Sequence, residues 1–243
     1  MQSKSLKIFR NWTEARIQND LGIEYIDDAP LIKSLSIIKG TVPEKYIEFL
    51  NTLSVVLRSK HPKWNEQELA VRFIGPLLST LQFEGKGYNF YLERDLKGNF
   101  KDYELEGVVD GMVASGIDDP EVPYFFIHEY KRFKMGDSEP QGQVLIEMLV
   151  ALSNNMKDSE DSEPIYGCYI YGSIWKFVVV WQEDNSDNFY YAVSKTYDAT
   201  EIDKLHEIWL ILNNIKGIIE IRAAKQWERT KALREKERRK ESK

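Results

Sequence analysis

Residues 124–133 of the chain read YFFIHEYKRF, which is the clearest β-strand pattern in the sequence. Alternate residues of a strand share one face of the sheet, so Ile127, Glu129 and Lys131 are expected to point the same way. An acid and a lysine then lie in line with core residues. Charged groups are seldom buried without a partner or a metal ion, and a buried salt bridge alone is a costly use of them. The segment therefore predicts a site as well as a core strand.

An acid followed two residues later by lysine is a common spacing and has no meaning alone. It occurs at Glu84, Asp95, Glu129 and Glu241. The first two lie in polar turns that contain glycine, and the last lies in a charged tail. Glu129 alone of the four lies in a hydrophobic strand, so we take it as the functional candidate.

A second strand, at residues 105–114, carries Asp110 and is separated from the first by a loop over residues 116–123. Residues that face each other in an antiparallel hairpin have a constant sum of numbers. This loop gives a sum of 239, and Asp110 and Glu129 have the same sum. Facing Cβ atoms lie ~4.5–5.5 Å apart, and two carboxylates that close repel unless a cation lies between them. Mg²⁺ takes one or two carboxylates together with waters and phosphate oxygens.

Asp-Gly between apolar pairs is also a hairpin-turn signal. On that alternative, Val108-Val109 and Met112-Val113 flank a tight turn, and Asp110 is a turn residue. We favour the strand because the turn would leave very short strands on either side of it.

The rest of the chain predicts helices before and after the strands. A helix over residues 65–83 has Asn65 as its N-cap and a kink at Gly75-Pro76. The other expected elements are helices over 11–60 broken at Pro30 and 40–43, a strand at 88–92, a turn at 96–99, a helix at 140–154, strands at 165–171, 175–181 and 188–194, a helix capped by Asp198 or Thr200 and reaching Leu212, and a last helix after Gly217. This order predicts a mixed sheet covered by helices.

Composition places the chain among globular proteins. With 243 residues and a hydrophobic fraction of 42%, it fits one large domain or one domain with appendages. The single cysteine, Cys168, cannot build a disulfide framework or a thiolate zinc site, and we interpret it as a small buried hydrophobe. Residues 1–7 lack the apolar run of a signal peptide, and no stretch approaches the ~20 apolar residues of a membrane span. We expect a soluble, cytoplasmic protein without a membrane partner.

Charge is distributed unevenly along the chain. Residues 222–243 contain ten Lys/Arg and four Glu, which is a net charge of +6. Because the whole chain has a net charge of −6, the remaining residues carry −12. An acidic body argues against a broad electrostatic grip on nucleic acid. The basic terminal helix is compatible with local phosphate contacts or with a partner helix, and a solvated helical tail is the alternative.

Asp110, followed by Glu129-Tyr130-Lys131 in a hydrophobic strand, resembles the PD-(D/E)XK nuclease superfamily. The helix at residues 68–78 resembles the first core helix of the nuclease domains in type I restriction motor subunits. Gln141-Gly142-Gln143, which opens the next helix, resembles the glutamine motif of some branches. The order of elements over residues 65–194 also fits. The usual proline before the aspartate is Val109 here, and no Gly-x-x-x-x-Gly-Lys-Ser/Thr motif is present, so the ATP-driven motor is absent.

The resemblance implies an α/β (α+β mixed) fold with a restriction-endonuclease-like mixed central sheet over residues 63–198. An N-terminal helical extension (1–62) and C-terminal helices with a basic tail (199–243) would flank it. It also implies a divalent-metal-dependent nuclease, an Mg²⁺-dependent phosphodiesterase acting on DNA in restriction, defence or repair, with Mn²⁺ as a substitute.

The resemblance further assigns the site residues. Asp110 and Glu129 would hold the metal with the carbonyl of Tyr130 and, through water, with Glu68. Lys131 would orient the attacking water or stabilise the charge that develops on the phosphate. Gln143 would orient substrate or water.

Several of these residues have plainer alternatives. Glu68 can be a capping residue, and Gln143 an ordinary polar residue of a first helical turn. His128 falls on the opposite face from Glu129 and is expected to be packed. The aromatic residues Tyr169, Tyr171, Trp175 and Trp181 could stack nucleic-acid bases, but sheet core is the better interpretation.

At the level of the whole protein, two rivals to the nuclease stay open. One is a catalytically inactive nuclease-like fold that serves as a nucleic-acid or protein binding or regulatory module. The acidic body and the missing motor favour it. The other is a helical assembly protein that forms a homodimer, or binds a partner protein, through its C-terminal helix.

Overall fold

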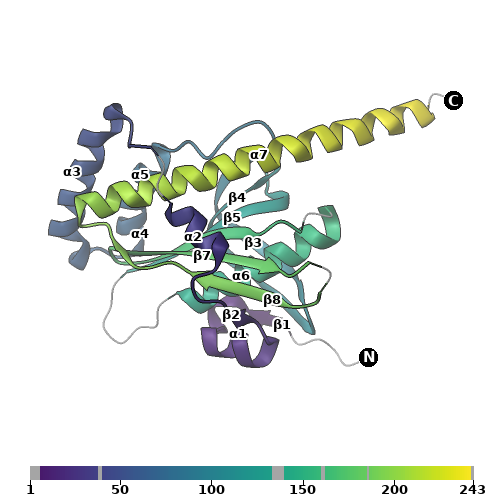
Figure 1. Cartoon of the computed structure of the whole chain (residues 1–243), viewed down its shortest axis with the longest axis horizontal. Helices are drawn as coiled ribbons and strands as arrows, with labels where there is room; N and C mark the ends of the chain where they lie inside the picture. Colours follow the sequence, from purple (N-terminus) through teal and green to yellow (C-terminus); the bar gives the residue numbers. More distant parts are fainter. Residues whose placement is uncertain (1–5, 38–39, 133–139, 160–161, 185, 242–243) are drawn as a thin grey trace.

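The structure, a computed structural model, describes residues 6–37, 40–132, 140–159, 162–184 and 186–241. Its described residues form one mixed sheet of nine strands with helices on both faces (Figure 1). The strands follow the order β1-β4-β5-β6-β7-β8-β2, while β3 pairs with β4 and β9 pairs with β7 outside this path. The expected mixed sheet flanked by helices, with a long C-terminal helix, is confirmed.

The elements have the following bounds. The strands are β1 (Leu6–Ile8), β2 (Glu24–Tyr25), β3 (Asn89–Phe100), β4 (Tyr103–Ser115), β5 (Glu121–Lys131), β6 (Ile165–Tyr171), β7 (Ile174–Gln182), β8 (Phe189–Val193) and β9 (Tyr197–Asp198). The α-helices are α1 (Glu14–Leu21), α2 (Pro30–Ser36), α3 (Glu44–Lys60), α4 (Glu66–Leu69), α5 (Gly75–Ser79), α6 (Gln141–Asn154) and α7 (Ile202–Glu241). Short helical turns are η1 (Phe9–Asn11), η2 (His61–Lys63), η3 (Ala70–Ile74) and η4 (Asn155–Ser159).

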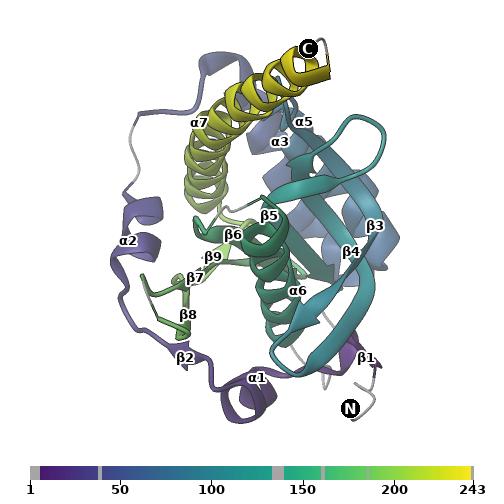
Figure 2. The ribbon, with the colours of Figure 1, turned by 90° about the vertical axis from the view of Figure 1, so that its right-hand side faces the viewer.

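Strand β5 is the segment quoted at the start, and it lies between two hydrophobic clusters. Phe126 belongs to the cluster that includes α2 to α5 and α7, whereas Ile127 belongs to the cluster that includes α1 and α6. Figure 2 shows α6 and α7 on opposite sides of the strands. Because strand residues alternate, Glu129 shares the face of Ile127, on the side of α6. Phe133, the last residue of the quoted segment, lies outside the described residues.

Helix α6 connects β5 to β6, which run parallel and therefore need such a crossover. The helix is apolar nearly all round, as expected for one that is enclosed by protein, and its residues from Val144 to Leu152 are all buried. Its start packs closely on the segment before α1. A Cβ at Gly142 would meet the backbone oxygen of Trp12 at 2.4 Å, so the glycine of the Gln-Gly-Gln motif allows this contact.

The turn predicted at residues 96–99 is wrong. Strand β3 continues through it to Phe100, and the chain reverses at Lys101, which has a φ of 51°. Leu96 and Phe100 are buried in the cluster around α6, so packing holds the polar stretch between them in an extended form. In Figure 2 the long β3–β4 hairpin curves past α6.

The break predicted at Gly217 is also wrong, because α7 is one helix from Ile202 to Glu241. A glycine inside a helix costs ~1 kcal/mol relative to alanine. Ile215 and Ile219 are fully buried on either side of it, and this packing outweighs the local cost. The kink predicted at Gly75-Pro76 stays a prediction, and the structure places a π-helical turn, η3, immediately before these residues.

The first 62 residues contribute to the sheet and to both clusters. β1 pairs with β4, and β2 pairs with β8, so short strands that the sequence pattern did not reveal extend the sheet. Leu21 packs in the α6 cluster, and Leu50 packs in the α7 cluster. None of the helices within the described ranges combines the length and apolar character that crossing a bilayer requires.

Gly111 lies opposite His128 in the β4–β5 ladder, and the histidine ring fills the space beside it. A Cβ at residue 111 would meet His128 Nε2 at 2.0 Å. Stacking on Phe90, with ring centroids 5.7 Å apart, holds the ring in place.

We expect G111A to lower the free energy of unfolding by about 1–3 kcal/mol, as overpacking of a core does. Urea unfolding measures this. In the H128A background the same change should cost less, and equal costs in both backgrounds would contradict the packing explanation.

Candidate active site

Asp110 lies where β4 and β5 separate. The ladder pairs Gly111 with His128, Met112 with Ile127 and Val113 with Phe126, all with the predicted sum of 239, and it ends at the first of these pairs. Asp110 and Glu129 are the next residues outward. They therefore lie at a fork between the two strands and not in a paired ladder.

The β3–β4 register also omits Asp110. Its counterpart in β3 is Glu93, which has a φ of 48°. The Asp110 side chain instead accepts a hydrogen bond from the backbone N–H of Tyr130, with Oδ2 at 2.9 Å from the nitrogen. Because Asp110 lies inside a 13-residue strand, the alternative of a tight turn at Asp110-Gly111 is wrong.

Glu129 is fully buried and has one strong partner. Its Oε1 accepts from Lys131 Nζ at 2.9 Å, no N–H or hydroxyl donor of the described residues reaches its Oε2, and the Asp110 carboxyl group is close enough to share a proton with it. The Lys131 side chain is 37% exposed, so the ion pair connects the core to the surface. The two side chains share one face of β5, as the alternation predicts.

Burial and crowding hold these acids toward their neutral forms. Burial raises the pKa of Glu129 to about 8, with a further contribution from the charge of Asp110. Burial also raises the pKa of Asp110, although the Tyr130 N–H and the Lys131 ammonium oppose that shift. Burial lowers the pKa of Lys131, but Glu129, Asp110 and Glu66 together outweigh it, so the net shift is upward. Perturbed pKa values of this kind cluster at functional sites.

Glu147 of α6 is a third acid, which the sequence analysis missed. It is fully buried; its Oε1 accepts from Gln143 Nε2 at 3.1 Å, and its Oε2 is unpartnered. Burial, followed by the charges of Glu129 and Asp110, raises its pKa well above the usual value. The signal was present as a lone glutamate in the apolar run VLIEMLVAL at residues 144–152.

Glu68 forms the capping box predicted as its alternative. Its backbone N–H donates to Asn65 Oδ1 at 2.8 Å, its Oε2 accepts from Asn65 N at 3.1 Å, and its Oε1 lies 3.6 Å from Arg72. The acid of this helix that acts on the site is Glu66, whose charge raises the pKa of Asp110 and of Lys131. Glu68 is thus committed to the helix, and its place as a metal ligand remains a prediction.

Tyr130 and the glutamine motif border the same cluster. Tyr130 contacts Asp110 through its amide N–H, and the assignment of its carbonyl to a metal remains a prediction. Gln143 is tied to Glu147, four residues later on α6. Gln141 accepts from the hydroxyl of Tyr169 at 2.6 Å, and Tyr169 is the partner of Glu129 in the β5–β6 register. Both glutamines of the motif therefore contact residues that surround Glu129.

The packed interpretation of the other candidates is confirmed. His128 is 1% exposed, and burial lowers its pKa to about 4, which keeps the ring neutral. Cys168 is buried, and burial raises its pKa. Tyr169, Tyr171 and Trp175 are buried in the sheet, and Trp181 packs against the α7 cluster.

Comparison with known proteins adds no identity. No protein-family model matches the chain, and no curated protein matches it. Inference about function therefore rests on the site itself.

The donor set suits a hard divalent cation. Among the described residues, no group of three or more His, Cys, Asp or Glu side chains is arranged to hold a metal ion. Mg²⁺ needs fewer protein ligands, because it takes one or two carboxylates and completes its octahedron with water and phosphate oxygens. Asp110 and Glu129 provide that set, and the buried Oε2 of Glu129, beyond reach of any described N–H or hydroxyl donor, is an atom that a cation would satisfy.

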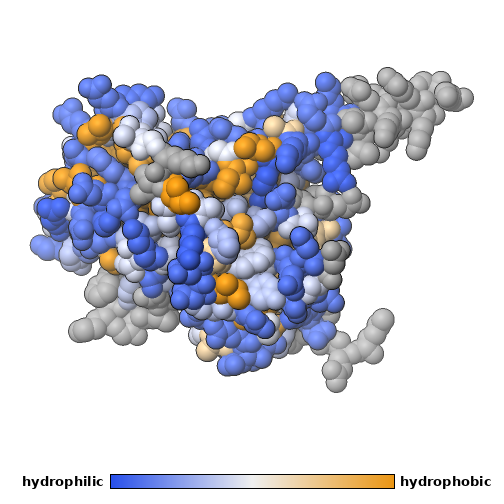
Figure 3. Space-filling view, in the orientation of Figure 1, coloured by the Kyte–Doolittle hydropathy of each residue, from blue (hydrophilic) through white to orange (hydrophobic). Residues whose placement is uncertain are grey.

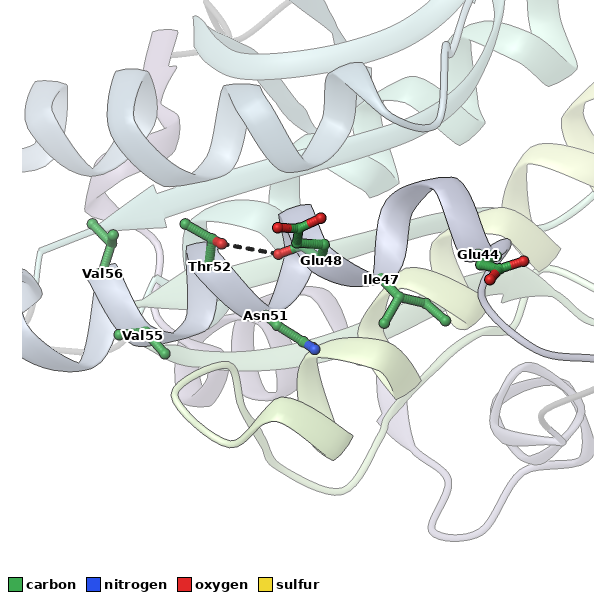
Figure 4. Close-up of a pocket in the computed structure, with 7 residues that line it drawn as sticks. All are labelled: Glu44, Ile47, Glu48, Asn51, Thr52, Val55 and Val56. Carbon is green, nitrogen blue, oxygen red and sulfur yellow. Dashed lines mark hydrogen bonds between the residues drawn. The ribbon is translucent and has the colours of Figure 1, made fainter.

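A hollow of about 650 Å³ on α3 has different chemistry (Figure 4). Its walls come from a single helix and include Ile47, Val55 and two acids, Glu44 and Glu48. Thr52 donates to the backbone oxygen of Glu48. Figure 3 shows apolar side chains over α3 and over the middle of α7, on a face that is otherwise mostly hydrophilic. The hollow shares no residue with the acids around Lys131.

The raised pKa of Glu129 has a consequence for metal-free stability. A glutamate titrates at 4.5 when unperturbed and at about 8 in the fold, so the folded protein binds more protons than the unfolded chain between these values. The contribution of Glu129 to the free energy of unfolding is therefore fully present below pH 4.5 and is lost as the pH rises through about 8. We expect urea unfolding in the presence of a chelator to give a lower free energy of unfolding at pH 8.5 than at pH 6. In E129Q the free energy of unfolding should depend less steeply on pH. Equal slopes would contradict the assignment.

Proposed function

We propose that the protein is a divalent-metal-dependent phosphodiesterase of the PD-(D/E)XK kind that hydrolyses nucleic acid, with DNA as the first substrate to test. The observation that carries the proposal is the fully buried Glu129. It keeps one oxygen on Lys131 and the other beyond the described N–H and hydroxyl donors, at a strand fork beside Asp110. A buried carboxyl group kept in this state costs folding free energy that a bound cation would return.

The order of elements around the fork supports the family assignment. Helices α4 and α5 precede β3, β4 carries Asp110, β5 carries Glu129 and Lys131, and α6 leads to the parallel strand β6. This is the order of helix, strands with the aspartate, strand with Glu-x-Lys, helix and strand that the resemblance implies. We propose a restriction-endonuclease-like core on this basis.

In the proposed reaction, Asp110 and Glu129 hold the metal and Lys131 acts at the reacting phosphate. A bound Mg²⁺ would polarise the phosphate and lower the pKa of the attacking water. Lys131 extends from the buried Glu129 toward solvent, so its ammonium can stabilise the charge that develops on the phosphate oxygens. The Tyr130 N–H fixes the Asp110 carboxyl, and Gln143 provides an amide to orient water or substrate.

Calorimetric titration with Mn²⁺ tests the proposal directly. Metal binding must remove the proton from Glu129, so we expect the affinity to rise by up to about tenfold per pH unit below pH 8 and to level off above it. Repeating the titration in buffers of different ionisation enthalpy measures the released proton. D110N should abolish the binding, whereas D118N, in the exposed β4–β5 loop, should leave it intact. A wild-type protein that binds no Mn²⁺ would refute the proposal.

The binding-module alternative has an observation of its own. A groove of about 890 Å³ runs between the β4–β5 loop and α7. Its wall includes Trp227 and Lys231. Trp227 is 40% exposed, and Lys86 Nζ lies 5.4 Å from the centroid of its ring. Trp227 and the two lysines can hold a base and a phosphate of single-stranded nucleic acid, although the same wall also contains the acids Asp118, Asp119 and Glu121. If W227A loses retention of single-stranded DNA in fluorescence anisotropy while the wild type binds no metal, the module is the better description.

A further inference from the structure

Glu147 is an acid that the proposed reaction does not require. It is fully buried in α6, and the other eight residues of its run from 144 to 152 are apolar. Helices enclosed by protein rarely contain an acid, because burying a carboxyl group costs folding free energy. The unpartnered Oε2 makes the cost larger. A residue that burdens the fold in this way is a candidate for a functional role.

The contact of Glu147 defines how Gln143 is oriented. Glu147 Oε1 can only accept a hydrogen bond, whether or not the carboxyl group is protonated at its other oxygen. Gln143 must therefore present its NH₂ group to Glu147, with Nε2 at 3.1 Å from Oε1. The amide carbonyl oxygen of Gln143 is then directed away from Glu147 and is free to accept a hydrogen bond elsewhere.

The neighbours of Glu147 are the site residues themselves. The charges of Glu129, Asp110 and Lys131 all act on its carboxyl group, so it lies behind the same cluster. Gln143 is half-buried, one helical turn closer to the start of α6. The pair thus extends from the buried acids toward the edge of the site.

We propose that Glu147 is a positioning residue of the candidate active site, which fixes the Gln143 amide so that its carbonyl oxygen accepts from water at the metal or at the reacting phosphate. This role rests on the proposed function. Outer partners of this kind orient the groups that contact a metal, and their loss costs about 10–100-fold in metal affinity or activity.

A structural role and a positioning role predict opposite changes in stability. If Glu147 served the fold, its replacement by an apolar residue of similar shape would lower the melting temperature. A positioning acid with an unpartnered oxygen burdens the fold, so E147M should melt at the same temperature as the metal-free wild type or higher. E147Q retains the shape but can donate as well as accept, so it leaves the Gln143 amide free to turn.

The experiment compares E147M, E147Q, Q143A and the double variant Q143A/E147M. We expect E147M and E147Q to bind Mn²⁺ about 10–100-fold more weakly in calorimetry, and to lower kcat for DNA cleavage more than they raise KM. Because Glu147 acts through Gln143, E147M should have little further effect in the Q143A background. E84Q, an acid-to-amide change on an exposed acid, is the control.

The outcomes separate this inference from the proposed function. If D110N abolishes Mn²⁺ binding while E147M and E147Q bind as the wild type does, the role of Glu147 is refuted and the metal site stands. The positioning role would also be refuted if the losses of Mn²⁺ affinity in Q143A and E147M multiplied in the double variant. A clear fall in the melting temperature of E147M would refute it as well. If the wild type neither binds Mn²⁺ nor cleaves DNA, both proposals are refuted together.

Discussion

D110N is expected to lose metal-dependent DNA cleavage by about 10²–10³-fold, the size of effect seen when one electrostatic stabiliser of a transition state is removed. The substitution takes away the charge of one of the two proposed metal ligands. It does not take away the acceptor for the Tyr130 N–H, because the asparagine carbonyl oxygen can replace Oδ2 in that 2.9 Å contact. The fold should therefore persist, and the loss should belong to the chemistry.

Cleavage of single- and double-stranded DNA and of RNA, with Mg²⁺ or Mn²⁺, measures the effect and identifies the substrate. The matched control is D102N, which changes an exposed aspartate in the turn between β3 and β4. Circular dichroism establishes that both variants are folded. Cleavage by D110N at the wild-type rate would remove Asp110 from the site and, with it, the nuclease assignment.

K131M is expected to lower cleavage by a similar factor of about 10²–10³, with little loss of stability. The charge of Lys131 lowers the pKa of Glu129, so its removal shifts that pKa further above 8. Breaking a buried ion pair normally costs ~3–5 kcal/mol because an uncompensated charge is left behind. Here Glu129 can instead remain protonated, and the free energy of unfolding at pH 7 should change by only about 1 kcal/mol.

A pH readout distinguishes this explanation from a simple loss of contact. In K131M the pH above which Mn²⁺ affinity levels off should lie higher than in the wild type, because Glu129 gives up its proton less readily. K97M is the matched control, since Lys97 belongs to an exposed acid-x-Lys pair and bridges Glu104 at 2.9 Å on the surface. An unchanged pH profile in K131M would show that Lys131 does not govern the protonation of Glu129.

The two variants probe one electrostatic balance. Three acids, Asp110, Glu129 and Glu147, interact with the Lys131 ammonium group, and burial raises the pKa of each of these acids. Such a cluster holds more protons than isolated acids would at neutral pH. A divalent cation would displace those protons and relieve the repulsion, which is why the proposal centres on metal binding.

The sequence by itself determined the local parts of this site. The alternation in residues 124–133 placed Glu129 and Lys131 on one face, and the loop length gave the register that three residue pairs of the ladder obey. Both follow from short-range geometry, because strand periodicity and hairpin pairing depend on neighbours along the chain. The apolar character of residues 141–154 likewise gave α6.

The tertiary structure alone decided which distant acids meet. Glu147 comes to the β4–β5 fork because the α6 crossover lies over that face, and Glu66 acts on Asp110 while Glu68 is used by its own helix cap. The uninterrupted course of β3 through residues 96–99 and of α7 through Gly217 was set by buried neighbours and not by local propensity. The physical reason is the same in each case: burial against partners distant in sequence outweighs the ~1 kcal/mol that a single residue contributes to its local conformation.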